Sequence, residues 1–467
     1  MPSQPVDAQQ IQGNILRPFG GAHQAFVALS FRNDRPGARR WLAGAATRVT
    51  ATDAVPPRGD SRLAPGQTLL NVGLTATGLV LLHPETAGPL SAYGAFWQGP
   101  LGTRFDDNDR LTTAPALLGD VGTSDPAEWV VGGLRRPVDA LLTIAAGDEE
   151  SLDQAVEREF TAAAGLEVVY VQRCKVLRDR PGGRRVEHFG FTDGISQPGV
   201  KGFPDAERRP GSPEIAVGEF VLGYVGERRP LSWAPRPVPP NWMHGGSFQV
   251  FRRLRQDPKG FWERMTELAR DQGTTPEQAA AHALGRHLDG TPLAEPNVNR
   301  GNENAFTYDE DRDGDRTPLF AHIRKVNPRE DKVFRDRGHK MLRRGITYGP
   351  RFQRDNPDDA ERGLVFNSYV TSIEDQFEFI QCRWANDPGF PSTTLAKYGR
   401  TPAEEVNGLD PVLGDSPEAA ERRLPEEVFK QIKRSAFGGF VTTTGAVYAF
   451  APSMSTLRSL AGDEPLG

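Results

Sequence analysis

The sequence predicts an α+β protein built from two units of similar size. Three observations support this fold class. Strand-like and helix-like segments alternate in both halves of the chain, its 467 residues are enough for two or three domains, and a charged stretch rich in proline and glycine at 204–217 separates the halves. We therefore expect one domain over residues 1–205 and a second over residues 206–467.

Short runs of β-branched, aromatic and aliphatic residues predict the strands. Near the end of the chain, two such runs over 439–450 surround Thr444-Gly445, which predicts a hairpin. The other expected strands are 24–31, 138–145 and 167–172 in the first half and 220–224, 247–254 and 377–382 in the second.

Apolar residues spaced by three or four predict the helices. Thr275-Pro276 and Ser416-Pro417 each place a capping hydroxyl before a proline at the first helical position, which indicates where two of the helices begin. The expected helices are 36–46, 151–164, 257–272, 275–287 and at least one more within 416–435.

The composition excludes several classes of protein. The formal net charge is -5 and the arginines are mixed with acids, so the chain has no basic face and is not expected to bind nucleic acid. The only two cysteines, Cys174 and Cys382, exclude a disulfide framework and a cysteine-ligated zinc or iron–sulfur site. The polar start at 1–14 and the lack of a run of about 20 apolar residues predict neither a secretory signal nor a membrane span, and hence a cytoplasmic protein.

Three segments carry residues that could do chemistry, and the first is FGFTDGISQP at 189–198. Taken alone, Asp193-Gly194 is typical of a turn with a helix-capping aspartate. Gly190, three residues earlier, and the flanking phenylalanines suggest a backbone that packs closely against something flat.

The other two segments supply a histidine and a pair of arginines. His322, one of eight histidines, lies in AHIRKVNPR; a lone histidine is usually a surface or core residue, and a metal ligand needs an acceptor on its other ring nitrogen. Arg343 and Arg344 precede Gly345. Such a pair usually lies in a solvated loop, but arginine can also supply a site with a positive charge at any working pH.

The order of these segments resembles the dye-decolorising peroxidase family, in the form of its larger bacterial and fungal branch. The motifs that carry the resemblance are Gly190-x-x-Asp193-Gly194, then Ala321-His322-Ile323-Arg324-Lys325, then Arg343-Arg344-Gly345. Further matches along the whole chain are Ile11 to Leu16, Asn71 to Leu74, Leu118 to Asp120 with Trp129, Gly246 to Phe248, and Gly408 to Asp410. The resemblance implies two ferredoxin-like α+β modules that face each other, with haem b in the second.

The resemblance also implies a role for each candidate residue. His322 would be the haem iron ligand, and Asp410, which could otherwise be a turn residue, would hold the histidine ring. On the other face, Asp193 would move a proton between the peroxide oxygens and Arg343 would stabilise the developing negative charge. Arg343 is chosen over its neighbour because the family arginine lies two residues before the glycine. Further haem contacts would come from Ile195, Gln197, Arg329, Leu364 and Phe366.

The implied reaction is the reduction of hydrogen peroxide coupled to one-electron oxidation of bulky dyes and of phenolic or lignin-like compounds. Mn(II) is a further candidate reducing substrate, and the chain could form homo-oligomers. The segment Asp309-x-Asp311-x-Asp313-Gly314 begins like a calcium loop, but Phe320 occupies its twelfth position, so we interpret it as structural. Aromatic residues that could relay a radical to a bulky dye are Trp233, Trp242, Trp262, Trp384, Tyr348 and Tyr369.

Three other functions are compatible with parts of the pattern. A non-enzymatic haem-binding or iron-release protein would keep His322 without needing both Asp193 and Arg343. A haem enzyme such as chlorite dismutase would lack the Gly-x-x-Asp-Gly segment. The tail at 461–467 gives little support to a role as cargo of a protein shell.

Overall fold

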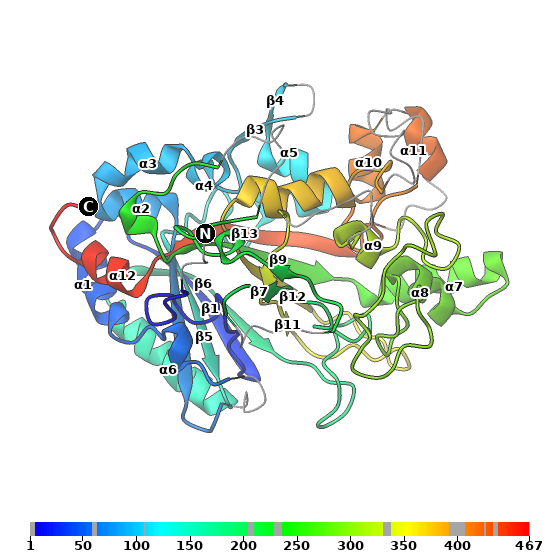
Figure 1. Ribbon diagram of the computed structural model, residues 1–467, viewed down its shortest axis with the longest axis horizontal. Coiled ribbons are helices and arrows are strands. Elements are labelled where there is room, and N and C mark those ends of the chain that lie inside the picture. The colour runs from blue at the N-terminus through cyan, green and yellow to red at the C-terminus, as the bar shows by residue number, and fades with distance from the viewer. Residues whose placement is uncertain are drawn as a thin grey trace.

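Strands and helices alternate along the described part of the chain in the computed structural model (Figure 1). The structure describes residues 5–57, 63–106, 109–203, 210–227, 236–329, 338–391, 407–424, 426–432 and 438–466. None of the helices in these ranges is long and apolar enough to cross a membrane.

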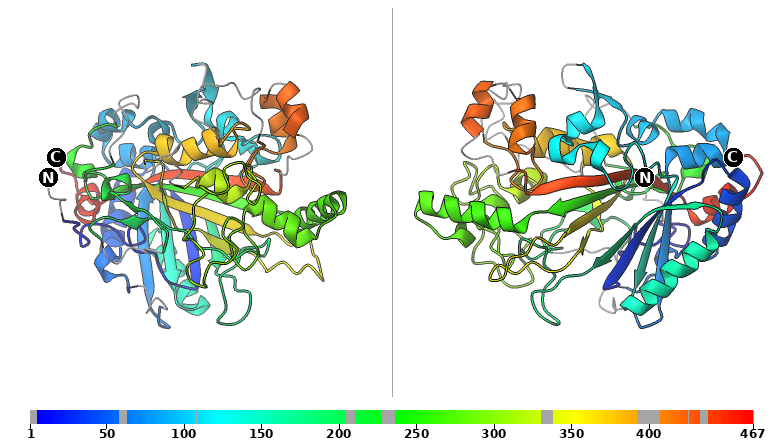
Figure 2. Two further views of the ribbon diagram at one scale, coloured as in Figure 1. Left: turned by 45° about the vertical axis from the view of Figure 1, so that its right-hand side comes forward. Right: turned by 180° about the vertical axis from the view of Figure 1, so that it is seen from behind.

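The first half of the chain forms a four-stranded antiparallel arrangement in the order β2-β5-β1-β6. Two helices connect these strands in the βαββαβ manner of a ferredoxin-like module, and α6 lies along the strands (Figure 2). The elements are β1 (His23–Ser30), α1 (Arg35–Ala46), β2 (Thr68–Leu74), β5 (Ala140–Ala146), α6 (Glu149–Ala162) and β6 (Glu167–Lys175).

The second half repeats this topology. Its strands follow the order β10-β12-β9-β13, with β11 also paired to β12. The strands are β9 (Ser247–Gln256), β10 (Leu342–Arg343), β11 (Ile346–Tyr348), β12 (Gly363–Val370) and β13 (Val441–Ala451). The helices are α7 (Pro258–Gln272), α8 (Pro276–Leu284), α9 (His322–Val326), α10 (Pro417–Arg423), α11 (Glu426–Ile432) and α12 (Met454–Ala461).

Shorter helices and strands lie in the connections between the main elements of the two modules. They are α2 (Ala76–Leu82), α3 (Ala87–Ser91), α4 (Gly94–Gln98), α5 (Ala114–Leu118), β3 (Thr103–Phe105), β4 (Leu111–Thr113), β7 (Gly199–Val200) and β8 (Glu214–Ile215).

The two modules share one core. Phe450 of β13 pairs with Leu74 of β2, so all the module strands belong to one sheet. The ring of Phe26 in β1 lies 5.3 Å from that of Phe251 in β9, in an apolar cluster that contains residues of both modules. Fully buried polar side chains also meet between the modules, where the amide Nε2 of Gln249 in β9 donates to Thr143 Oγ1 in β5 at 3.3 Å. Burial of this surface explains why the modules form one body.

Most predicted elements are confirmed, and three strand predictions are wrong. Residues 220–224 form turns after a short 3-10 helix at Val217–Glu219, because Gly223 adopts a left-handed φ of 85° against the ring of His244. The run 377–382 lies within a π-helical stretch at 373–385, coloured gold in Figure 1. The expected hairpin at 439–450 is the single strand β13.

The glycine of the expected hairpin explains the last of these errors. The pairing register of β13 shifts between Thr443 and Gly445, which is a β-bulge rather than a turn. Gly445 lies directly against the backbone of Val131, so no side chain would fit there. The predicted domain boundary between residues 205 and 206 lies outside the described residues and stays a prediction.

Candidate active site

Asp193 lies in an irregular segment whose backbone is tied down on both sides. Its N–H donates to Arg185 O at 2.9 Å, and both the N–H and the hydroxyl of Thr192 donate to Leu288 O at 2.9 and 3.0 Å. Gly190 and Gly194 adopt φ values of 102° and 72°, which glycine tolerates far better than other residues. The Asp193 side chain is exposed, and its Oδ1 accepts the N–H of Gly194 at 2.6 Å. The segment therefore presents a carboxylate from a fixed backbone.

Both ends of this segment are fastened to the strands around Arg343. After the aspartate, Gln197 brackets the Arg343 backbone: its Nε2 donates to Arg343 O at 2.7 Å, and its Oε1 accepts the Arg343 N–H at 3.3 Å. The Arg343 guanidinium donates to Ser196 O. Before the aspartate, His188 Nε2 donates to Tyr348 O at 2.8 Å. Burial lowers the pKa of His188 to about 4, so this imidazole is neutral at working pH.

The register of the sheet sets the direction of Arg343. Arg343 pairs with Ser368 across β10 and β12. Because side chains alternate along a strand, Arg343, Phe366 and Leu364 belong to the same face of the sheet. Phe366 and Leu364 are partly exposed there. Ile195 lies against Gly290, beside the carbonyl that holds Thr192. The structure therefore places Ile195 and Gln197 on the Asp193 segment, and the two apolar residues on the face that carries Arg343.

Arg344 has a different environment from its neighbour. It is 7% exposed, and its guanidinium donates to three backbone carbonyls near the start of the chain: Asn14 at 2.7 Å, Ile15 at 2.8 Å and Leu16 at 3.3 Å. These contacts give Arg344 a structural task. They support the assignment of Arg343, rather than Arg344, to the site.

His322 is the first residue of the short helix α9. Its Nδ1 lies 2.9 and 3.1 Å from the two carboxylate oxygens of Asp410, which is fully buried. Gly408, with a φ of 108°, packs on Phe320 and so brings Asp410 beside the histidine. Burial alone would raise the pKa of Asp410. The charge and hydrogen bond of His322 and the backbone N–H groups of Leu413 and Val412 outweigh that effect, so the pKa of Asp410 is lowered. An ionised Asp410 holds the proton of His322 on Nδ1.

This arrangement fits a haem group. With Nδ1 engaged, His322 has its Nε2 lone pair available, and no hydrogen bond to Nε2 is present among the described residues. Arg329 is also buried; its guanidinium donates to Asn304 and Phe306, and Nε has no partner in the described part of the chain. An imidazole held by a carboxylate is typical of a haem iron ligand, and a buried arginine suits an anionic haem substituent.

Other candidate residues lie apart from this constellation. Asp311 accepts the backbone N–H groups of Arg316 and Thr317 and pairs with Arg324, so the segment that begins like a calcium loop has a structural use. Among the proposed radical relays, Trp233 lies outside the described residues. The other five are buried: Trp242, Trp262, Trp384, Tyr348 and Tyr369.

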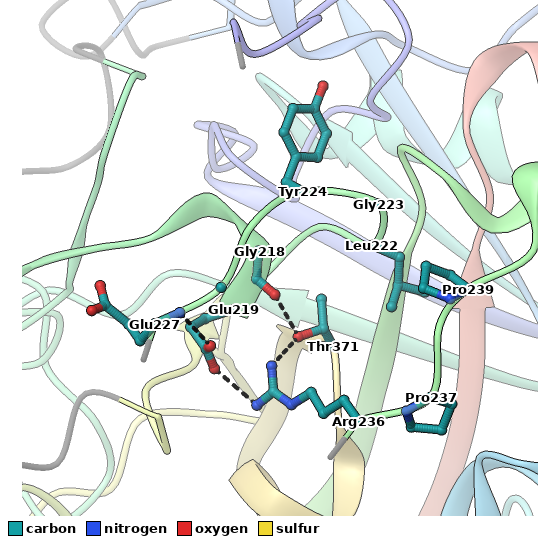
Figure 3. Close-up of a pocket in the computed structure, with 11 residues that line it drawn as sticks. Gly218, Glu219, Leu222, Gly223, Tyr224, Glu227, Arg236, Pro237, Pro239 and Thr371 are labelled. Carbon is teal, nitrogen blue, oxygen red and sulfur yellow. Dashed lines mark hydrogen bonds and ion pairs between the residues drawn. The ribbon is translucent and has the colours of Figure 1, made fainter. Parts of the chain in front are cut away.

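A hollow of about 220 Å³ beside Arg236 contains none of the predicted site residues (Figure 3). The Arg236 guanidinium lies 2.8 Å from Glu219 Oε2 and donates to Thr371 Oγ1 at 2.7 Å. Because the cation is matched by a carboxylate within the hollow, this region does not provide the charge that a peroxide would need.

Sequence reasoning missed the residues that position the site. Gln197 was expected at the haem, but its contacts with Arg343 could not be inferred because the two are 146 residues apart. Glu187 was not singled out. The only signal was an acidic residue next to Val186 and two residues before Phe189, and that signal does not reveal what the carboxylate binds.

Comparisons with known proteins identify the class. Residues 232–401 match the family model for the C-terminal part of Dyp-type peroxidases. A multifunctional dye peroxidase, DyP2, of an Amycolatopsis species is 33% identical over 97% of this chain and 95% of its own. The crystal structure of a DyP-type peroxidase from Anabaena has a TM-score of 0.75 and 25% identity, covering 97% of this chain and 94% of its own.

A dye-decolorising peroxidase solved with 2,6-dimethoxyphenol is equally similar in fold. Its TM-score is 0.75 at 25% identity, over 98% of this chain and 100% of the solved one. Fold and comparisons together define a haem-dependent peroxidase, an oxidoreductase that acts on peroxide. The chain belongs to the dye-decolorising peroxidase family.

The two adjacent arginines give a first prediction, because their substitution should affect different properties of the protein. Arg344→Gln should lower the free energy of unfolding by about 2–4 kcal/mol, since buried carbonyls lose a charged donor. Arg343→Gln should leave unfolding nearly unchanged and slow the reaction with peroxide about 100-fold or more. Urea unfolding of the haem-free variants and stopped-flow mixing of the haem-loaded variants with peroxide measure the two effects. A reversed pattern would contradict the assignment of the two residues.

Proposed function

We propose that this chain binds haem b through His322 Nε2 and uses Asp193 and Arg343 to reduce hydrogen peroxide while it oxidises dyes and phenolic compounds. The observation that supports this most is the contact between His322 Nδ1 and the buried Asp410 at 2.9 Å. A carboxylate in this place orients the ring and makes the imidazole a stronger electron donor.

Other residues would hold the haem in place. Leu364 and Phe366 would provide an apolar wall, Ile195 and Gln197 would border the peroxide side, and Arg329 would neutralise an anionic substituent. When bound, the haem iron supplies the redox chemistry that peroxide reduction and one-electron oxidation require. The protein supplies orientation, proton transfer and charge stabilisation.

Asp193 is the proton carrier in this proposal. Its carboxylate takes a proton from one peroxide oxygen and gives it to the other, which leaves as water when the O–O bond breaks. Arg343 stabilises the negative charge that develops on the departing oxygen. The Arg343 guanidinium donates to Ser196 O, and Gln197 Nε2 donates to Arg343 O. Arg343 is thus attached to the segment that carries Asp193, which supports their acting together.

The reducing substrates in this proposal are aromatic. The solved relative that holds 2,6-dimethoxyphenol supports a phenolic substrate, and the relatives named for dye decolorisation support bulky dyes. Oxidation of Mn(II) stays a prediction: the described residues contain no group of three or more His, Cys, Asp or Glu side chains placed to hold a metal ion.

An optical titration tests the function. Purified wild-type protein loaded with haem should show a ferric band, and one equivalent of hydrogen peroxide should change that band rapidly. A phenol such as 2,6-dimethoxyphenol should then restore the starting spectrum. A haem band that ignores peroxide would favour the alternative of a non-enzymatic haem-binding or iron-release protein. Failure to bind haem after reconstitution would refute the proposal.

A further inference from the structure

The turn that precedes Asp193 is built around one carboxylate. Glu187 Oε2 accepts the backbone N–H of Phe189 at 2.9 Å, and Oε1 accepts the N–H of Phe191 at 3.0 Å. The main chain closes the same turn, since Glu187 N–H donates to Phe191 O at 3.1 Å and Gly190 N–H donates to Glu187 O at 3.0 Å. The carboxylate therefore occupies the inside of the turn, and Asp193 follows two residues after its end.

The same carboxylate fastens the turn to the sheet. Gln256, the last residue of β9, donates from Nε2 to Glu187 Oε2 at 2.8 Å. The rings of Phe189 and Phe191 are held by Phe261 of α7, with centroids 4.4 and 6.4 Å apart. Aromatic packing fixes these side chains, and Glu187 fixes the backbone between them. The turn is thus rigid because of one acidic group that carries three hydrogen bonds.

The negative charge of Asp193 acts on Glu187 through space. Desolvation raises the pKa of Glu187 to about 7; the hydrogen bonds from Phe189, Gln256 and Phe191 oppose this rise, and the negative charge of Asp193 adds to it. The Asp193 carboxylate is therefore near enough for its charge to be felt at Glu187. The Glu187 carboxylate itself accepts hydrogen bonds from Phe189, Phe191 and Gln256. Its effect on Asp193 is therefore indirect and acts through the turn.

We propose that Glu187 is a positioning residue for the peroxide reaction: its carboxylate holds the turn at 187–191 so that Asp193 presents its own carboxylate in the geometry that proton transfer needs. The inference rests on the proposed function of Asp193. Proton transfer depends steeply on placement, because a shift of about 1 Å can cost about 100-fold in rate.

The variant Glu187→Gln tests the contact without changing side-chain size. A glutamine has one acceptor oxygen and one NH₂ group, so one of the two backbone N–H groups would face a donor. In haem-free protein, hydrogen exchange at the amide of Phe189 or Phe191 should become at least tenfold faster. Glu263→Gln, an exposed glutamate on α7, is the matched control and should leave these amides unchanged.

Peroxide kinetics test the catalytic consequence. In haem-loaded protein, Glu187→Gln should lower the second-order rate constant with peroxide at least tenfold while haem content and the ferric spectrum stay as in wild type. In an Asp193→Asn background, the same change should alter the constant by less than twofold, because Glu187 acts through the aspartate. A residue that merely stabilises the fold would slow both backgrounds alike.

The outcomes separate this inference from the proposed function. If wild type reacts with peroxide and Glu187→Gln reacts equally fast, or if its effect persists in the Asp193→Asn background, the positioning role is refuted and the function stands. If wild type binds haem but ignores peroxide, the proposed function fails, whatever hydrogen exchange shows about the turn.

Discussion

His322→Ala should abolish stable haem binding. The variant lacks the only proposed iron ligand, and Asp410 would be left as a buried carboxylate without its imidazole partner. We expect the affinity for haem to fall at least about 100-fold, which is more than the loss caused by removing a residue that only orients a ligand. Haem titration followed by the optical band, with apoprotein as reference, measures the affinity.

Two further variants make the His322 result interpretable. His282→Ala removes an exposed histidine of α8 and should bind haem like wild type. Asp410→Asn should retain haem but weaken it by about 10–100-fold, because the imidazole loses the acceptor that orients it. If His322→Ala bound haem with an unchanged spectrum and affinity, the iron ligand would have to be another residue.

Asp193→Asn should bind haem normally and react with peroxide about 100- to 10,000-fold more slowly. An amide keeps the size of the side chain but cannot accept and return a proton, so the loss should equal the usual contribution of general acid–base catalysis. Stopped-flow measurement of the haem band after mixing with peroxide gives the rate constant directly. The rate of phenol oxidation at saturating peroxide should fall less than this rate constant if a later step limits turnover.

The matched control for this variant is Asp179→Asn. Asp179 is exposed in the loop before the segment at 189–198, and its substitution should leave the peroxide reaction within about twofold of wild type. An Asp193→Asn protein that kept the wild-type rate would assign proton transfer to a different group. Arg343 could not replace the aspartate, because its guanidinium does not give up a proton at working pH.

How far the sequence predicts the fold depends on whether the signal is local. The strand at 24–31 and the helix at 257–272 were found because their pattern repeats with the period of the element itself. The run at 377–382 reads as a strand but is helical. There Glu378 pairs with the buried Arg104 and accepts the Tyr448 hydroxyl at 3.0 Å, and such tertiary contacts have no signature in a short apolar run.

The candidate site likewise contains residues that the sequence predicts and residues that only the structure reveals. Asp193, His322 and Arg343 were identified because their motifs resemble a family, and Asp410 because it follows Gly408 in a further match. The resemblance did not show which side chains hold these residues. Gln197 and Glu187 exert their effects through backbone groups, and any sequence can supply backbone groups. Only the folded chain reveals such partners.

Arg344 has a consequence for the order in which the protein can be completed during synthesis. Its guanidinium binds the carbonyls of residues 14–16, and Gln12 donates to Pro452 O at 2.8 Å. Residues 12–16 thus wait for partners made more than 300 residues later. Because domains generally fold as the chain emerges, the N-terminal module can form early, whereas residues 12–16 gain these partners only after the second module has been made. Haem capture should therefore follow the synthesis of the second module.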